Sequence, residues 1–156
     1  MRYLIIILLS VAFLIPGCAE HVMGCNVLLA AGLHHFFHGN VFHLAANGLA
    51  VWYLFRKWNL TELFIAWLIA SLSYFASPAI GASNIIYAVM GLRTPPVGSS
   101  WWRRPETVIF IIITLLMLLI PGISGITHII SFVAGTLTAS VVRFIRQTRN
   151  DCSRYI

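Results

Sequence analysis

Long apolar stretches separated by short polar segments run through the whole chain. Their lengths predict six helical segments, at residues 3–17, 28–55, 60–76, 83–92, 106–120 and 126–145. A helix that spans a bilayer needs about 20 apolar residues, and several of these segments approach that length. The alternation of apolar and polar residues that marks half-buried strands is absent. The pattern therefore predicts an all-α membrane protein with one domain, residues 1–156, and a tail at 146–156.

Composition strengthens the membrane interpretation. Of the 156 residues, 60% are hydrophobic and only 9% are charged. Soluble globular domains carry about 25% charged residues, so a water-soluble core fits poorly. The length allows one domain.

The net charge of +6 could indicate a nucleic-acid partner, but the positions of the basic residues argue against it. If the amino terminus is cytosolic and six segments alternate, all ten basic residues fall on the cytosolic side, as the positive-inside rule requires. We therefore expect both termini inside and no nucleic-acid site. The ten are Arg2, Arg56, Lys57, Arg93, Arg103, Arg104, Arg143, Arg146, Arg149 and Arg154.

Two features near the amino terminus leave alternatives open. The first apolar segment ends at Ile15-Pro16-Gly17-Cys18 and could instead be a cleaved signal peptide, although cleavage would move the arginine-rich tail outside. Cys18 and Cys25 share the predicted first outer loop, residues 17–27, where a disulfide could form.

The segment from Ser83 to Leu92 is too short to span a bilayer. About ten helical residues measure roughly 15 Å, half of a hydrocarbon core of about 30 Å. If Arg93 marks the inner surface, Ser83 lies near the middle of the membrane, at the end of a loop that enters from outside. Irregular backbone at that depth requires protein cover or water, so the lengths predict a hydrated cavity at Ser83.

Polar and small residues share faces on three predicted helices. His43 and Asn47 lie at i and i+4 on the second, as do Ser83 and Tyr87 on the fourth. Small residues on the fourth and sixth helices form matching stripes that favour close packing between them. These stripes comprise Asn84, Ala88 and Gly91 on the fourth helix, and His128, Ser131 and Gly135 on the sixth.

At these positions the chain resembles the rhomboid intramembrane serine proteases. The second-span signature of that family is a histidine, four residues, then His-x-x-x-Asn. Its fourth-span signature is Gly-x-Ser-Gly with a tyrosine four residues after the serine, and its last span carries a histidine above small residues. The corresponding residues here are His38, His43, Asn47, Gly81, Ser83, Tyr87, His128, Ser131 and Gly135.

The resemblance implies a six-helix rhomboid-like bundle and a Ser-His dyad. Ser83 would be the nucleophile and His128 its general base, with Tyr87 packed against the His128 ring. The Ser83 backbone amide, the Asn47 amide and the His43 ring would hold the oxyanion. Of the four carboxylates of the chain, Glu20 lies in the predicted outer loop and the other three lie on the cytosolic side, so we expect no third catalytic member and no cofactor or metal; the three are Glu62, Glu106 and Asp151.

The resemblance also implies a substrate and a location. The substrate would be a single-span membrane protein cut near its outer face. The protein would be a multi-pass component of a cell membrane, of the bacterial inner-membrane kind. The predicted first outer loop is shorter than in better-known family members.

Two departures from the family pattern leave a second function open. Asn84 follows the serine where the family has glycine, and Ser131 stands one turn below His128 where glycine is usual. Both would add bulk at the join of the fourth and sixth helices. An inactive rhomboid-like protein that binds membrane clients is therefore an alternative.

A histidine-based metal site is a third interpretation. It would use His34 and His38, at i and i+4, together with His43. Otherwise His34 and His35 are expected at the membrane interface.

Overall fold

The computed structural model describes residues 2–15, 17–54, 59–96, 98–117 and 124–152. These residues form α-helices and short 3-10 helices with no strand, which confirms the all-α fold class. The elements in chain order are α1 (Arg2–Leu14), α2 (Cys18–Cys25), α3 (Val27–Leu33), η1 (His34–Phe36), α4 (Val41–Leu54), α5 (Leu60–Ser73), α6 (Ser83–Leu92), η2 (Ser100–Arg103), α7 (Pro105–Met117) and α8 (Gly125–Cys152).

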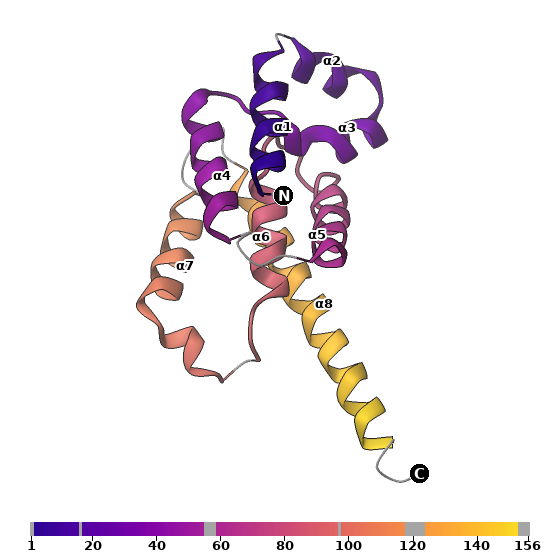
Figure 1. Ribbon diagram of the computed structural model, residues 1–156, viewed down its shortest axis with the longest axis vertical. Coiled ribbons are helices and arrows are strands. Elements are labelled where there is room, and N and C mark those ends of the chain that lie inside the picture. The colour runs from indigo at the N-terminus through magenta and orange to yellow at the C-terminus, as the bar shows by residue number, and fades with distance from the viewer. Residues whose placement is uncertain (1, 16, 55–58, 97, 118–123, 153–156) are drawn as a thin grey trace.

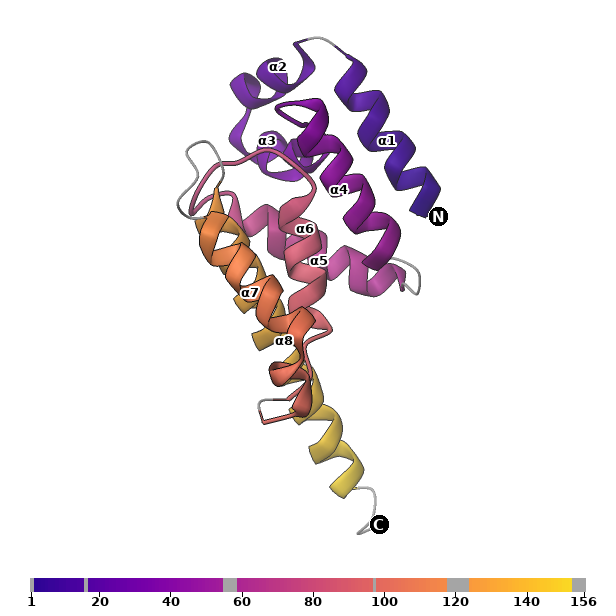
Figure 2. The ribbon, with the colours of Figure 1, turned by 90° about the vertical axis from the view of Figure 1, so that its left-hand side faces the viewer.

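The short helix α6 occupies the centre of the molecule (Figure 1). It packs most extensively against α8, then against α5, and it also contacts α4 and η1. Helix α1 pairs with α4, and α7 packs on α8 and η2. Figure 2 shows that α8 continues well beyond the other helices. Because α6 touches so many elements, a side chain at its first turn can meet residues from several parts of the chain.

Helices α6 and α8 approach each other at two facing glycines. A β-carbon added at Gly91 would lie 2.2 Å from the Phe132 carbonyl oxygen, and one added at Gly135 would lie 2.4 Å from the Ala88 carbonyl oxygen. Real side chains essentially never come so close to backbone, so only glycine permits this separation of the helix axes. The predicted pairing of small residues on these two helices is confirmed at Ala88, Gly91 and Gly135.

The prediction of one continuous helix over residues 28–55 is wrong. The apolar stretch divides into α3, η1 and α4, with Phe37–Asn40 between η1 and α4. Two asparagines start the helices: the Asn26 side chain accepts from the Leu28 amide at 2.8 Å, and the Asn40 side chain accepts from the His43 amide at 2.9 Å. The segment between α1 and α4, residues 15–40, is called the outer loop below; it is longer than the predicted loop at residues 17–27.

Cys18 and Cys25 begin and end the same helix, α2. Their side chains lie outside the described residues. A rise of about 1.5 Å per residue separates the two Cα atoms by about 10 Å, whereas a disulfide spans at most about 7 Å. The backbone therefore argues against the bridge that the sequence left open.

Other boundaries differ less from the predictions. Helix α6 covers the predicted residues 83–92, while α1 and α5 each end three residues before the predicted 17 and 76. Helix α8 continues through most of the predicted tail to Cys152. The predicted end of the fifth segment, residues 118–120, lies outside the described residues.

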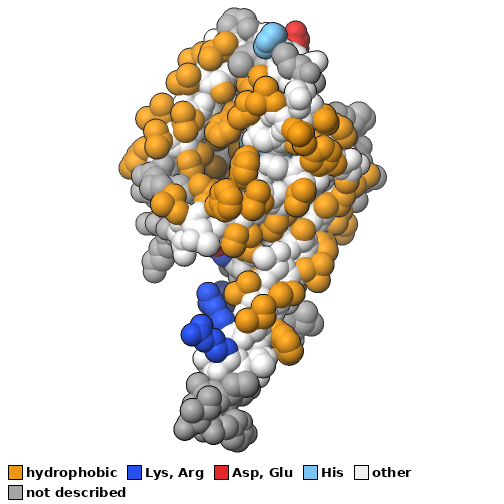
Figure 3. All heavy atoms as spheres, turned by 90° about the vertical axis from the view of Figure 1, so that its right-hand side faces the viewer, with side chains coloured by type: hydrophobic (Ala, Val, Ile, Leu, Met, Phe, Trp, Pro, Cys, Tyr) orange, Lys and Arg blue, Asp and Glu red, His pale blue; other side chains and the backbone are white. Residues whose placement is uncertain are grey.

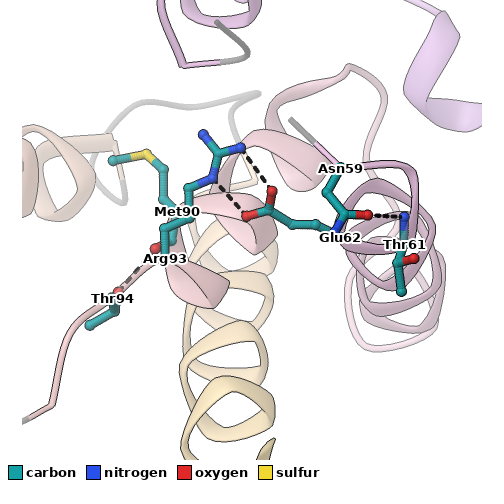
Figure 4. A network of polar contacts seen from close by, with 6 residues as sticks. All are labelled: Asn59, Thr61, Glu62, Met90, Arg93 and Thr94. Carbon is teal, nitrogen blue, oxygen red and sulfur yellow. Dashed lines mark hydrogen bonds and ion pairs between the residues drawn. The ribbon is translucent and has the colours of Figure 1, made fainter. Parts of the chain in front are cut away.

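One end of the bundle carries charged contacts (Figure 4). Arg93, just after α6, forms a two-point ion pair with Glu62 at the start of α5, with nitrogen–oxygen distances of 2.6 and 2.8 Å. Arg143 of α8 donates to the Thr94 carbonyl oxygen at 2.8 Å. Hydroxyls occupy the opposite ends of these helices: Ser77 and Ser124 are bonded at 2.8 Å. The two ends of the bundle thus differ in charge.

Length and composition make α8 the one helix in the described part of the chain that could cross a membrane unaided, over Gly125–Asn150. The apolar helices α1, α4, α5 and α6 are shorter. Many large hydrophobic side chains are exposed on the helices around α6, including Phe42 of α4, Leu72 of α5 and Leu137 of α8. Figure 3 shows such side chains covering most of one face, with basic side chains toward the end where α8 projects.

Candidate active site

The candidate nucleophile is the first residue of a helix. Helix α6 begins at Ser83, and the loop from Ser77 leads into it through Gly81. Gly81 has a φ of 120°, a left-handed conformation that L-residues with side chains rarely adopt. Its amide donates to the His34 carbonyl oxygen at 3.0 Å, which ties this loop to the outer loop. The Ser83 hydroxyl is thus held at the positive end of the helix.

Ser83 and His128 meet as predicted. His128 Nε2 lies 2.7 Å from Ser83 Oγ, within the range of a hydrogen bond between nucleophile and base. The two residues are 45 positions apart and reach each other because α6 and α8 pack so closely. Ser83 is partly accessible and the His128 ring is buried. The arrangement can transfer a proton from the hydroxyl to the imidazole.

Tyr87 fixes the plane of the His128 ring, also as predicted. The two rings are stacked with centroids 4.5 Å apart and planes only 4° from parallel. The Tyr87 hydroxyl is hydrogen-bonded to Thr114 Oγ1 of α7 at 3.1 Å. The His128 ring therefore has a stacking partner that is itself held by a third helix.

Among the described residues, the other His128 nitrogen, Nδ1, is buried without a hydrogen-bond partner. Glu62 is paired with Arg93 at the far end of α6, and Glu20 is exposed in α2. The side chains of Glu106 and Asp151 lie outside the described residues. The geometry of the described residues is that of a pair, Ser83 and His128, rather than a triad.

His43 and Asn47, one turn apart on α4, both face Gly81. A β-carbon there would lie 2.6 Å from His43 Nε2 and 3.4 Å from Asn47 Nδ2. Asn47 Nδ2 is buried and, within the described part of the chain, makes no hydrogen bond. A buried amide donor without an acceptor is uncommon in proteins, and such groups call for an explanation. It can donate to an acceptor placed beside Ser83, which lies two residues after Gly81.

His38 lies behind His43. Their rings are 5.0 Å apart and meet edge to face. Burial, with a smaller contribution from His43, lowers the pKa of His38 to about 4, so its ring is neutral near pH 7. His38 thus backs the His43 ring without adding charge to the site.

The expectation that Asn84 and Ser131 crowd the join of α6 and α8 is not supported by their bonding. Asn84 Nδ2 bonds to His34 Nε2 of η1 at 3.2 Å, and Ser131 Oγ bonds to Ser73 Oγ of α5 at 2.9 Å. The Asn84 amide reaches η1 because α6 also contacts η1. The Ser131 hydroxyl reaches α5 because α8 also packs on α5. The tight contact lies further along, at Gly91 and Gly135.

His34 and His35 are fully buried rather than interfacial. The His34 Nδ1 atom donates to the Ala31 carbonyl oxygen at 2.9 Å, which leaves Nε2 to accept from Asn84. Burial lowers the pKa of His34 to about 4, consistent with this neutral form. His35 Nε2 is bonded to Ser71 of α5 at 3.2 Å. These rings anchor the outer loop onto α5 and α6.

The helical spacing proposed for a metal site is wrong. His34 belongs to η1 and His38 to the following loop, so the two are not one turn apart on a helix. Across the ranges that the structure describes, no group of three or more His, Cys, Asp or Glu side chains is placed to hold a metal ion.

Sequence reasoning missed the residues that brace the site from neighbouring helices. Thr114 is hydrogen-bonded to Tyr87, Ser73 to Ser131, and Ser71 to His35. At the end of the bundle opposite Arg93, Thr127 donates to the Ser77 carbonyl oxygen at 2.8 Å. Each is a hydroxyl on an apolar helix, and lone hydroxyls in apolar segments were the only available signal.

Comparisons with known proteins add no family assignment. No model of a known protein family matches this chain, and no curated protein matches it either.

Proposed function

We propose that this chain is an intramembrane serine endopeptidase of the rhomboid type. The observation that carries the proposal is the 2.7 Å contact between Ser83 Oγ and His128 Nε2, with Tyr87 stacked on the imidazole. The buried Asn47 donor beside Gly81 adds a candidate for oxyanion stabilisation.

The membrane bundle in this proposal has six spans: α1, α4, α5, α6, α7 and α8. Exposed hydrophobic side chains on the five of these helices that surround α6, and charged residues at one end of the bundle, support it (Figure 3). Helix α6, at ten residues, is half the length of a span, which puts Ser83 near mid-depth if Arg93 lies at the inner surface. Reporter fusions after Arg103 and Arg149 should locate both inside; an external reporter at either would contradict the six-span topology.

The reaction follows from the positions of the groups. Ser83 Oγ attacks the carbonyl carbon of the scissile peptide bond while His128 Nε2 accepts the hydroxyl proton. The Ser83 amide, His43 and Asn47 face the resulting oxyanion; one such donor is worth about 3–4 kcal/mol. His128 then gives the proton to the departing amine, which leaves an ester on Ser83. Water, deprotonated by His128, hydrolyses that ester and restores the serine.

A single-span membrane protein is the proposed substrate. A dyad at the outer end of a half-length helix can be reached by a segment that unwinds near the outer membrane face. Glycine and other weak helix formers cost least to unwind, so we expect cleavage beside them. Cleavage of soluble unfolded chains, with no cleavage of spanning ones, would contradict this substrate class.

A serine-directed fluorophosphonate probe tests the dyad directly. The purified parent should label, and Ser83→Ala and His128→Ala should each abolish labelling. The double variant should lose no more than either single variant, because the two residues act as one unit. Ser140→Ala is a matched control, since among the described residues its exposed hydroxyl bonds within α8 alone: it donates to the Thr136 carbonyl oxygen and accepts from Arg143. Asn47→Ala should retain measurable activity because two proposed oxyanion donors remain.

The client-binding alternative is separated by the same experiment. A folded parent that never labels and never cuts a spanning substrate would favour it over the protease. The bulk at Asn84 and Ser131 that motivated this alternative is directed away from the α6–α8 contact. No contact in the described residues specifically favours client binding.

A further inference from the structure

The hydrogen bond between Thr114 and Tyr87 connects the dyad to α7, a helix that carries neither Ser83 nor His128. Thr114 lies on α7, and its Oγ1 atom is 3.1 Å from the Tyr87 hydroxyl. Both side chains are buried. At that bond, Tyr87 reaches from α6 across to α7 while its ring covers His128 of α8.

A stacked ring orients an imidazole only while it is itself held. Stacking leaves a ring free to slide or rotate within its own plane. Such aromatic pairs contribute only about 0.5–1.5 kcal/mol beyond area burial. A buried hydroxyl bond at the far end of the tyrosine removes that freedom. The bond thus keeps the Tyr87 ring in place over the His128 ring, with the ring centroids 4.5 Å apart.

Helix α7, which carries Thr114, packs against fewer elements than α6 does. It packs on α8 and η2, whereas α6 is enclosed by α4, α5, α8 and η1. A displacement of α7 would break the Thr114–Tyr87 bond before it disturbed the contact between Ser83 and His128. The Thr114–Tyr87 bond therefore links the position of α7 to the His128 ring, in addition to the packing of α7 on α8.

We infer that Thr114 is a positioning residue that acts through Tyr87 to hold the His128 ring in line with Ser83, so that the dyad is competent only when α7 is docked. This inference rests on the proposed function. It assigns Thr114 no contact with substrate, and it predicts an effect on turnover rather than on substrate binding.

The test uses the full-length protein and two substitutions that break the same bond from opposite sides. Thr114→Val and Tyr87→Phe each remove one hydroxyl at nearly constant shape. Each should lower kcat and the rate of fluorophosphonate labelling about threefold to tenfold, with KM nearly unchanged. Thr114→Ser keeps the hydroxyl and should retain most of the parent rate.

A double-mutant cycle distinguishes loss of the Thr114–Tyr87 bond from a general loss of packing around the site. Thr114→Val combined with Tyr87→Phe should be no slower than the slower single variant, because both remove one interaction. Thr138→Val is the matched control: its hydroxyl bonds to Ala134 within α8, so labelling should stay at the parent rate.

The outcomes are distinct. Parent-like labelling of Thr114→Val, multiplied losses in the double variant, or failure of Thr114→Ser to restore the rate would each overturn the positioning role while the protease proposal stands. A parent that neither labels nor cleaves would overturn the proposed function, and this inference with it.

Discussion

The α6–α8 contact and the outer loop both position the candidate dyad, but by different means. Between α6 and α8 the backbones touch at Gly91 and Gly135, and one hydrogen bond joins Ser83 to His128. The outer loop is instead attached by a small buried cluster of Ala30 and Ala31 with Tyr74, and by single polar contacts scattered along it. The Trp67 indole donates to the Gly32 carbonyl oxygen, His35 meets Ser71, and Asn84 meets His34.

This difference shows which contacts can be predicted from a short stretch of sequence. Close helix packing depends on small residues repeated every three or four positions, and that repeat is visible within each segment. The loop contacts instead join residues about 35 to 50 positions apart. Nothing in the loop's own sequence shows which buried partner each polar group will meet. We therefore expect α6–α8 to respond sharply to added volume and the outer loop to respond to the loss of single bonds.

The largest effect is expected at the glycine contact. Gly91→Ala would place a β-carbon against backbone atoms of Phe132 and Thr136, so α8 must move away. Overpacking of this kind should lower the free energy of unfolding by about 3 kcal/mol and disable the dyad. Unfolding in mixed detergents measures the stability change.

Gly48→Ala is the control for that substitution, because a β-carbon at Gly48 on α4 has open space around it. It should be neutral or stabilise by about 0.5–1 kcal/mol through helix propensity. Equal losses at Gly91 and Gly48 would refute the close-contact explanation.

The sequence predicted the helical class, the bounds of α6 and the contact between Ser83 and His128, because each depends on a periodicity or a short motif. It failed on residues 28–55, where hydropathy alone cannot distinguish one helix from two helices joined by a turn. The break requires Asn40 as a cap and burial of His34 and His35 against α5 and α6. It also misjudged Asn84, whose spacing placed it on a face but whose hydrogen bond goes to the outer loop.

A smaller loss is expected when that loop contact is removed. Asn84→Ala leaves His34 Nε2 buried without its donor, which should cost about 1–3 kcal/mol. Limited proteolysis within residues 15–40 should become faster as the loop detaches. Ser131→Ala breaks a comparably buried bond to Ser73 and should lower stability without exposing the loop. Faster loop cleavage in both variants would show that the attachment is not specific to Asn84.

Two helix caps give a narrower comparison. The Asn40 side chain caps α4 and the Asn59 side chain caps α5, with similar contacts of 2.9 and 2.8 Å to backbone amides. Replacing either with alanine should cost about 1 kcal/mol. Only Asn40→Ala loosens the turn that carries His43, so only that variant should also lower kcat. A matching fall in kcat for Asn59→Ala would mean that the loss reflects stability alone.

The smallest effect is expected at the Glu62–Arg93 pair, despite its two short contacts (Figure 4). Both side chains remain partly exposed, at 22% and 32%, and exposed pairs contribute about 0–1 kcal/mol. Backbone bonds from Arg93 to Val89 and from Thr94 to Gly91 already close the end of α6, and Arg143 holds Thr94 from α8. Glu62→Gln should therefore change stability by less than about 1 kcal/mol. Salt near 1 M, which shortens the Debye length to about 3 Å, should remove the difference from the parent. A loss above about 2 kcal/mol that persists in high salt would place the pair in a desolvated environment, and this end of the bundle would then be as sensitive as the glycine contact.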